Sequence, residues 1–213
     1  MNKENVENVS RETLHQILTK NLEKYGICIT EELAEKAFSF WEKLVFWNKT
    51  HNLTTVTDFH EAALLHFVDS LFPASEKNVF FDGAKVLDFG TGGGFPGIPL
   101  ALYFPKADFK LLDKSRKKIS FINLTAAELG IANAEGINQN FFDVTEKFDV
   151  VVSRAVRIDD EIFEHCRKII KPNGHLVVFY SSQQEPYKDP TLEYTKTYDF
   201  EKGDRVIAFY RFS

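Results

Sequence analysis

Cysteine is scarce in this chain, and its scarcity excludes several classes of protein. Only two of the 213 residues are cysteines, Cys28 and Cys166, and they form no Cys-x-x-Cys pattern. A disulfide-stapled fold or a zinc ribbon is therefore excluded, and a reducing compartment is favoured. His-Glu-x-x-His and comparable ligand clusters are also missing, so we expect no metal site. His60, His66 and His165 are expected on helix surfaces or in satisfied core positions.

Long apolar runs are missing as well. No stretch reaches the roughly 18 apolar residues that a membrane-spanning helix needs, and the polar start MNKENVENVSRETLHQ has no signal-peptide core. We therefore expect a cytoplasmic monomer without membrane contacts. The net charge of −5 argues against a surface that binds nucleic acid over its whole extent, but it allows a local basic patch.

Apolar and aromatic residues are present in quantity. They make up 44% and 14% of the chain, with 21 phenylalanines, which predicts a Phe-rich core. The first part has helical periodicity, with helices expected over Ser10–Tyr25, from Thr30 through Phe46, and over Asp58–Leu71. Strand patterning replaces it between Ser75 and Gly83. We therefore predict a helical region at 1–78 and a second domain at 79–213.

The second part alternates strands and helices, which predicts a Rossmann-like α/β fold with a mostly parallel sheet and helices on both faces. A final antiparallel hairpin is expected around Gly203, and the short Pro-containing segment before it leaves no room for a full crossover helix. The expected strands are Lys85–Phe89, Asp108–Leu112, Ala134–Asn138, Phe148–Ser153, His175–Tyr180, Leu192–Phe200 and Arg205–Phe212. The expected helices are Ile98–Phe104, Ser115–Leu129 and Asp159–Ile170.

The most informative segment is VLDFGTGGGFPG, residues 86–97. A strand ends at Phe89, and Gly90, Gly92 and Gly94 follow in a G-x-G-x-G pattern. Without Cβ atoms, such a loop turns sharply and lets a ligand lie against the backbone. By itself the loop is compatible with a dinucleotide or with S-adenosylmethionine.

Two carboxylates favour S-adenosylmethionine. Asp88, near the end of the first strand, would repel a pyrophosphate but attract the ammonium and sulfonium groups of S-adenosylmethionine. Asp113, at the end of the next strand, is placed to accept hydrogen bonds from ribose hydroxyls. A nicotinamide cofactor, or a tight turn with a solvated acid and no ligand, are the alternatives.

Two later segments complete the candidate site. The loop after the third strand carries Phe141 and Phe142, which either contact an adenine or belong to the core. Arg154 ends the fourth strand, where a guanidinium suits a carboxylate, a phosphate or a guanine edge; a surface salt bridge is the alternative. No Asp/Asn-Pro-Pro-aromatic turn and no strand-end cysteine are present, which leaves an already nucleophilic acceptor such as guanine N7, for which alignment suffices.

Several motifs resemble the glucose-inhibited division protein B (GidB) family of bacterial guanine-N7 methyltransferases, which act on small-subunit (16S) ribosomal RNA. The motifs are WNKTHNLT (47–54), HFVDSL (66–71), the glycine loop, Leu112-Asp113 and Ser153-Arg154-Ala155. The resemblance covers roughly residues 41–178. It implies a methyltransferase that uses S-adenosylmethionine and acts on ribosomal RNA.

Carried over by position, the family implies cofactor contacts from Gly90, Phe95, the backbone of Phe141 and Phe142, and Arg154. The resemblance also implies that Asn48, Asn52, His66, Asp69 and Ser70 line the junction of the helical part and the cofactor cleft, where Asn48, Asn52, His66 and Asp69 would be catalytic together with Arg154. A hydrogen-bonded seam between the two parts is the alternative role for them.

Three departures remove cations that family members usually carry. Asn140 stands in place of an arginine, Leu65 in place of another, and Ser181-Ser182 in place of a Lys-Gly pair. They keep two other hypotheses open: a divergent paralogue that methylates another RNA or a small molecule, and a non-catalytic cofactor-binding protein.

Overall fold

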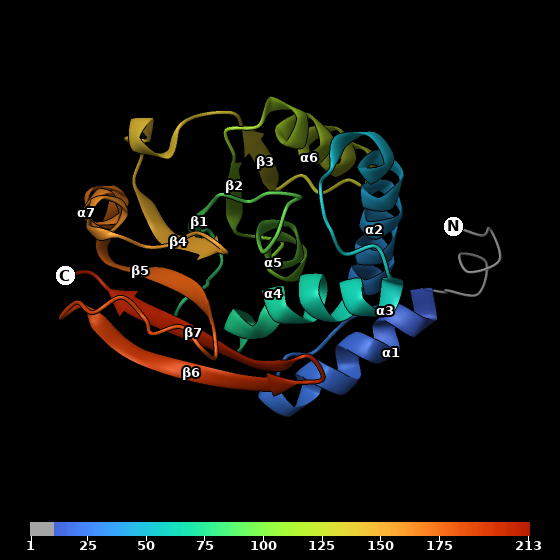
Figure 1. The fold of residues 1–213 in the computed structure, drawn as a ribbon, viewed down its shortest axis with the longest axis horizontal. Coiled ribbons are helices and arrows are strands. Elements are labelled where there is room, and N and C mark those ends of the chain that lie inside the picture. Colours follow the sequence, from blue (N-terminus) through green and yellow to red (C-terminus); the bar gives the residue numbers. More distant parts are fainter. Residues whose placement is uncertain (1–10) are drawn as a thin grey trace.

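A computed structural model describes residues 11–213 (Figure 1), and the expected N-cap Ser10 lies outside the described residues. Helix α1 spans Arg11–Leu22 and continues as a 3-10 turn, η2 (Glu23–Tyr25), which Gly26 ends with a φ of 74°. Helix α2 spans Glu31–His51, five residues beyond the expected Phe46. Thr30 caps it as expected, because its Oγ1 accepts a hydrogen bond of 3.2 Å from the Leu33 amide.

The third expected helix is present but irregular. It begins as α3 (Phe59–Ala62), becomes the π-helical segment η3 (Ala63–Val68), and returns to α-helix in α4 (Asp69–Leu71). A 3-10 turn, η4 (Phe72–Ser75), follows. π-Helical turns are rare and occur frequently at functional sites, and this one carries His66.

The sheet is mostly parallel, as the sequence predicts, in the order β3-β2-β1-β4-β5-β7-β6. The pairs β1–β2, β1–β4, β2–β3 and β4–β5 are parallel, whereas β7 is antiparallel to both β5 and β6. Strand β5 begins five residues before the expected His175. The strands are β1 (Lys85–Phe89), β2 (Asp108–Leu112), β3 (Ala134–Ile137), β4 (Phe148–Arg154), β5 (Ile170–Ser181), β6 (Leu192–Phe200) and β7 (Gly203–Arg211).

Helices cover both faces of the sheet, as predicted. Helices α5 (Gly97–Tyr103) and α6 (Arg116–Glu128) pack on one face, and α7 (Asp160–Ile169) packs on the other. Neighbouring strand residues point to opposite faces: Phe209 joins the first cluster and Tyr210 the second. Residues 182–191 form no helix, so the connection after β5 is shortened as expected.

The N-terminal helices and the sheet share one hydrophobic core. Buried side chains from α1, α2 and the third helix, among them Leu14, Phe40 and Phe67, lie in the same cluster as Phe109 of β2 and Phe209 of β7. The division into 1–78 and 79–213 therefore follows secondary structure rather than separate cores, and we keep it as a proposal.

Hydrogen bonds and ion pairs also join the β6–β7 hairpin to the helical region (Figure 1). The Tyr25 hydroxyl donates to Asp199 Oδ1 at 2.5 Å, and Lys24 pairs with the same carboxylate at 2.8 Å. Earlier in β6, the Lys196 ammonium contacts Glu76, which precedes β1. The hairpin therefore has a defined position relative to the N-terminal helices, and so do the side chains that β7 carries.

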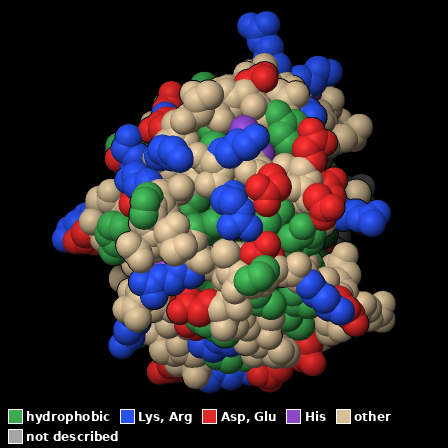
Figure 2. Space-filling model, turned by 90° about the vertical axis from the view of Figure 1, so that its left-hand side faces the viewer, with side chains coloured by type: hydrophobic (Ala, Val, Ile, Leu, Met, Phe, Trp, Pro, Cys, Tyr) green, Lys and Arg blue, Asp and Glu red, His purple; other side chains and the backbone are tan. Residues whose placement is uncertain are grey.

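The molecular surface mixes both signs of charge. Figure 2 views the side that carries α7 and the C-terminus, where Lys and Arg side chains lie among Asp and Glu side chains. This distribution agrees with the modest net charge of −5. Within residues 11–213, no helix combines the length and apolar character required to cross a membrane.

Candidate active site at the carboxyl edge of the sheet

The predicted site residues gather where the order of the strands reverses. Strands β1 and β4 are parallel neighbours, with Asp88 opposite Val152, and their connections leave in opposite directions. Open α/β sheets bind ligands at this kind of switch point, outside the carboxyl ends of the strands. The glycine loop follows β1 there, and Arg154 ends β4.

Close packing explains the glycines of the loop. A Cβ at Gly97 would lie 2.7 Å from Asp88 Oδ2 and 2.5 Å from Leu111 Cδ2, and Gly90 has a φ of +74° and no room for a side chain beside Val156. Both positions therefore exclude side chains. The loop holds its backbone directly over the end of β1, and the Phe95 ring on it is buried.

Asp88 lies beneath the loop rather than at its surface. Its side chain is fully buried, and its Oδ2 accepts hydrogen bonds from the Thr91 hydroxyl at 2.6 Å and the Gly97 amide at 2.8 Å. Its other oxygen, Oδ1, is buried without a partner among the described residues. Burial raises the pKa of Asp88 to about 6, opposed by the two hydrogen bonds and the charge of Arg154.

Asp113 joins the two loops that follow β1 and β2. The Gly92 amide donates to its Oδ2 at 3.1 Å, and the Ser115 amide donates to its Oδ1 at 2.7 Å. Lys118 approaches the same carboxylate at 3.5 Å. Two acids beside a glycine loop, one of them with an orphaned oxygen, fit a cationic nucleoside such as S-adenosylmethionine.

The two phenylalanines after β3 lie in different environments. Phe141 is buried and stacks on Phe89 with ring centroids 4.2 Å apart, so its ring belongs to the core. Phe142 is 39% exposed at the edge of the site. Asn140 caps the short turn η5 (Phe141–Asp143) by accepting the Phe142 amide. Only the backbone of this turn and the Phe142 ring are therefore positioned to contact a base.

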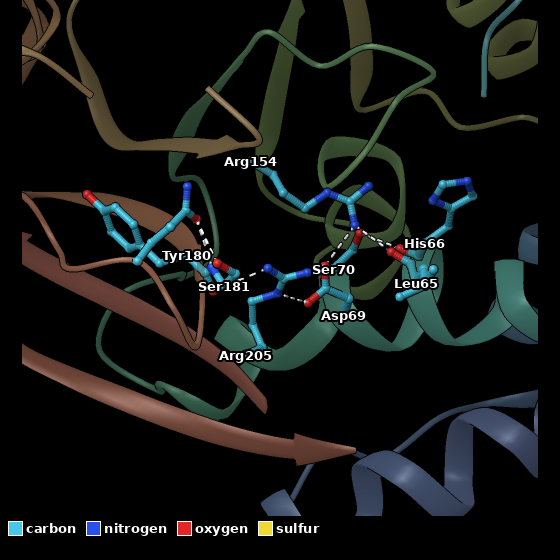
Figure 3. Close-up of polar contacts among 9 residues, drawn as sticks. Leu65, His66, Asp69, Ser70, Arg154, Tyr180, Ser181 and Arg205 are labelled. Carbon is cyan, nitrogen blue, oxygen red and sulfur yellow. Dashed lines mark hydrogen bonds and ion pairs between the residues drawn. The ribbon is translucent and has the colours of Figure 1, made fainter. Parts of the chain in front are cut away.

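One carboxylate shared by two arginines joins the helical region to the sheet (Figure 3). Asp69, fully buried on α4, accepts from Arg154 Nη1 at 3.0 Å and from Arg205 Nε and Nη2 at 2.6 and 3.1 Å. Figure 3 shows the Arg154 guanidinium approaching Asp69 from above and the Arg205 guanidinium approaching it from the left. Arg154 Nη1 also donates to the Leu65 carbonyl at 2.7 Å. The cluster carries one net positive charge.

Arg205 was missed by the sequence analysis. It lies on β7, 136 residues from Asp69 in the chain, in a hairpin whose pattern indicated only a strand. Its Nη1 also donates to the Tyr180 carbonyl at 3.2 Å. No local pattern marks this pairing, because it depends on the β5–β7 register, which places Arg205 opposite Ser181.

His66 is buried but not satisfied, contrary to the expectation for a core histidine. Its ring stacks on Phe95 with centroids 4.4 Å apart, and its Nε2 lies 2.8 Å from Thr54 Oγ1. Its Nδ1 is buried without a partner among the described residues. Burial and the charge of Arg154 lower the pKa of His66 to about 3, so the ring is neutral.

The other junction residues mainly organise the backbone. Asn48 Oδ1 accepts from the Leu53 and Thr54 amides at 2.6 and 2.9 Å, which fixes the turn after α2. Asn52 ends α2 in the left-handed region, with a φ of 48°. The buried Ser70 hydroxyl donates to the His66 carbonyl within the third helix. The WNKTHNLT and HFVDSL segments therefore meet the glycine loop and the end of β4.

Besides Asn140, the other two departures from the family pattern, Leu65 and Ser181-Ser182, are also visible in the structure. Leu65 lacks a cationic side chain, yet its carbonyl is an acceptor for Arg154. Ser181 hydrogen-bonds through its amide and hydroxyl to Gln184 at the end of β5, and Ser182 is exposed.

Among the described residues, no group of three or more His, Cys, Asp or Glu side chains forms a metal site.

Solved structures that resemble this chain support the fold. A methyltransferase from Aquifex aeolicus that depends on S-adenosylmethionine superposes with a TM-score of 0.57 at 16% identity, over 75% of this chain and 97% of its own. Magnesium protoporphyrin IX methyltransferase from Synechocystis, with S-adenosylmethionine bound, superposes with a TM-score of 0.56 at 15% identity, over 82% and 97% of the two chains. The seven-stranded sheet is thus that of the Rossmann-like methyltransferases.

Sequence comparison identifies the family. The family model described as rRNA small subunit methyltransferase G matches residues 33–202. The protein of that name from Lactobacillus johnsonii is 36% identical over 76% of this chain and 71% of its own length. The one from Mesoplasma florum is 33% identical over 82% and 73%. The chain belongs to the rRNA small subunit methyltransferase G family.

Proposed function

We propose that this protein transfers a methyl group from S-adenosylmethionine to guanine N7 in the 16S ribosomal RNA of the small subunit. The observation that carries the proposal is the ion pair between Asp69 and Arg154. It joins the HFVDSL motif of the helical region to the end of β4, beside the glycine loop. The name of the curated relatives supports ribosomal RNA as the substrate.

The site suits an acceptor that needs no general base. Guanine N7 offers its lone pair directly, and S-adenosylmethionine supplies the methyl group when it is bound. His66 is neutral, because its pKa is lowered to about 3. The work of the site is then to align the acceptor and to exclude water. The His66 ring stacks on the Phe95 ring, and the Arg154 guanidinium lies 5.6 Å from the centroid of the Phe95 ring, so the two rings support the position of Arg154.

We propose cofactor contacts on one side of the cleft and acceptor contacts on the other. The contacting residues are Gly90, Gly92, Gly94, Phe95, Asp113, the turn at Phe141 and Phe142, and Arg154, and Asp88 acts through its charge from beneath the loop. Those on the acceptor side are Asn48, Asn52, His66 and Asp69, with Arg154 between the two sets. Asp69 would act as a positioning residue, because its buried carboxylate orients both arginines. A cytoplasmic monomer is consistent with these roles.

A methyl-transfer assay tests this function. Purified protein and methyl-labelled S-adenosylmethionine are incubated with deproteinised 16S RNA and with intact small subunits that lack the modification. We expect label in a single guanine, detected by strand cleavage specific for N7-methylguanine. Cofactor binding without transfer to either RNA would instead support the non-catalytic protein, and label in another RNA or a small molecule would support the divergent paralogue. These alternatives are tested because Leu65 and Asn140 are neutral where family members usually carry arginine.

A further inference from the structure

The first turn of α6 carries cations where an isolated helix disfavours them. Arg116 and Lys117 occupy this turn, Lys114 precedes it, and no acidic residue is in the turn. The N-terminal end of a helix bears partial positive charge, so cations there are unfavourable unless an anion compensates them. Several other exposed lysines pair with acids, as Lys106 does with Asp82 at 2.7 Å.

No acid within the described part of the chain neutralises these three side chains. Lys114, Arg116 and Lys117 are exposed, and none of them forms an ion pair in residues 11–213. The nearest acid along the chain, Asp113, directs both oxygens to backbone amides and has Lys118 as its cationic neighbour. The three charges therefore point to solvent without a partner, in a protein whose net charge is −5.

We propose that Lys114, Arg116 and Lys117, together the α6 basic surface, bind the backbone of the substrate RNA while its target base enters the candidate site. This inference rests on the proposed function. Three neighbouring unpaired cations match a strand of phosphates, because phosphates pair with cations. The surface borders the candidate cofactor site, since it begins directly after Asp113, which contacts the glycine loop.

A charge-reversal variant tests the surface. In the triple variant Lys114→Glu, Arg116→Glu and Lys117→Glu, we expect 16S RNA to bind at least tenfold more weakly in a filter-binding assay at 0.1 M salt. The salt dependence should also weaken: at roughly 0.7 per lost phosphate contact, the slope of log K against log salt falls by about 2. The melting temperature should not drop, because acids favour the first turn of a helix.

The matched control reverses three exposed lysines elsewhere, Lys20, Lys77 and Lys188, and so changes the net charge equally. It should bind RNA within about twofold of the wild type. Equal weakening in both triple variants would overturn the proposal, since only overall charge would then matter, and so would an unaffected affinity in the α6 variant. If wild-type protein binds RNA through this surface but transfers no methyl group, the proposed function fails and the surface stands.

Discussion

Arg154 shows how one side chain can serve both the fold and a ligand. Its Nη1 donates to Asp69 and to the Leu65 carbonyl, whereas its Nε and Nη2 have no partner among residues 11–213. Its guanidinium carbon lies 5.6 Å from the centroid of the Phe95 ring on the glycine loop. The free donors of this largely buried group are therefore available to an anionic or base-edge ligand at the candidate site.

We expect Arg154→Lys to lower methyl transfer about tenfold or more, equivalent to about 1.4 kcal/mol in the barrier. The charge remains, but an ammonium cannot hold Asp69 and Leu65 and still present a planar fork to the ligand. The measurement is the initial rate with saturating cofactor. Arg157→Lys, an exposed arginine outside the cluster, is the control and should retain the wild-type rate. Equal rates in both variants would reduce Arg154 to a structural ion pair.

Asp88 should make cofactor binding depend on pH. Its pKa is raised to about 6 in the free protein, and its ionised form attracts the cationic cofactor. The affinity for S-adenosylmethionine should therefore rise as pH increases from 5 to 7 and then level off. In the free protein the same raised pKa stabilises the fold at low pH, and this contribution is lost as pH rises through about 6. The affinity is measured by calorimetric titration at several pH values. In Asp88→Asn the dependence of the affinity on pH should disappear. If the dependence is unchanged in that variant, another group causes it.

At the scale of elements, the site is a seam of three segments. Helix α4 supplies Asp69, strand β4 supplies Arg154, and strand β7 supplies Arg205. The side chains of these ion pairs are largely buried, with exposed fractions of 0%, 14% and 21%. Removing one partner from such a cluster leaves uncompensated charge in a low-dielectric environment. These ion pairs therefore hold the helical region in a defined position relative to the ends of β4 and β7.

Asp69→Ala should destabilise the protein by about 3–5 kcal/mol, because two guanidinium groups lose their shared carboxylate. Asp69→Asn keeps an acceptor oxygen and should cost less. Urea unfolding at pH 7.5 measures both changes. Asp199→Ala, which removes an exposed ion pair with Lys24, is the control and should cost about 1 kcal/mol or less. A cost for Asp69→Ala no larger than for this control would show that the arginines find other partners.

At the scale of the whole molecule, the helical region is part of the core rather than an appendage. Phe67 of the third helix and Phe72 of the turn η4 are buried in the same cluster as Val86 of β1 and Ile207 of β7. The hairpin closes the arrangement, because the fully buried Tyr198 stacks on Phe72 with centroids 4.6 Å apart. The sheet and the N-terminal helices should therefore fold as one cooperative unit.

The isolated segment 79–213 should accordingly fail to unfold cooperatively. Without the N-terminal helices, the apolar side chains that share the first cluster with them, and that α5 and α6 leave uncovered, would be exposed to water. Circular dichroism during a thermal melt, with the full chain as control, makes the comparison. A sharp transition in the segment, together with binding of S-adenosylmethionine, would instead establish 79–213 as an independent domain.

The sequence by itself determined most of the fold and the cofactor frame. Periodicity and turn residues predicted the order of strands and helices, because those signals are local. Gly90, Asp88 and Asp113 were recognisable because the end of a strand and the turn that follows it are adjacent in the chain. The WNKTHNLT and HFVDSL motifs were identified only through resemblance, since helical periodicity indicates burial but no function.

Only the tertiary structure decided which polar groups meet. Arg205 came to Asp69 through the register of β7, and that contact joins residues 136 positions apart. Phe141 and Phe142 could not be told apart in the sequence, because the fold alone sets which ring faces the core. The neutrality of His66 likewise depends on burial and on the charge of Arg154, which reaches it from another element. Such properties arise from groups brought together by long-range packing, and local sequence patterns carry no record of that proximity.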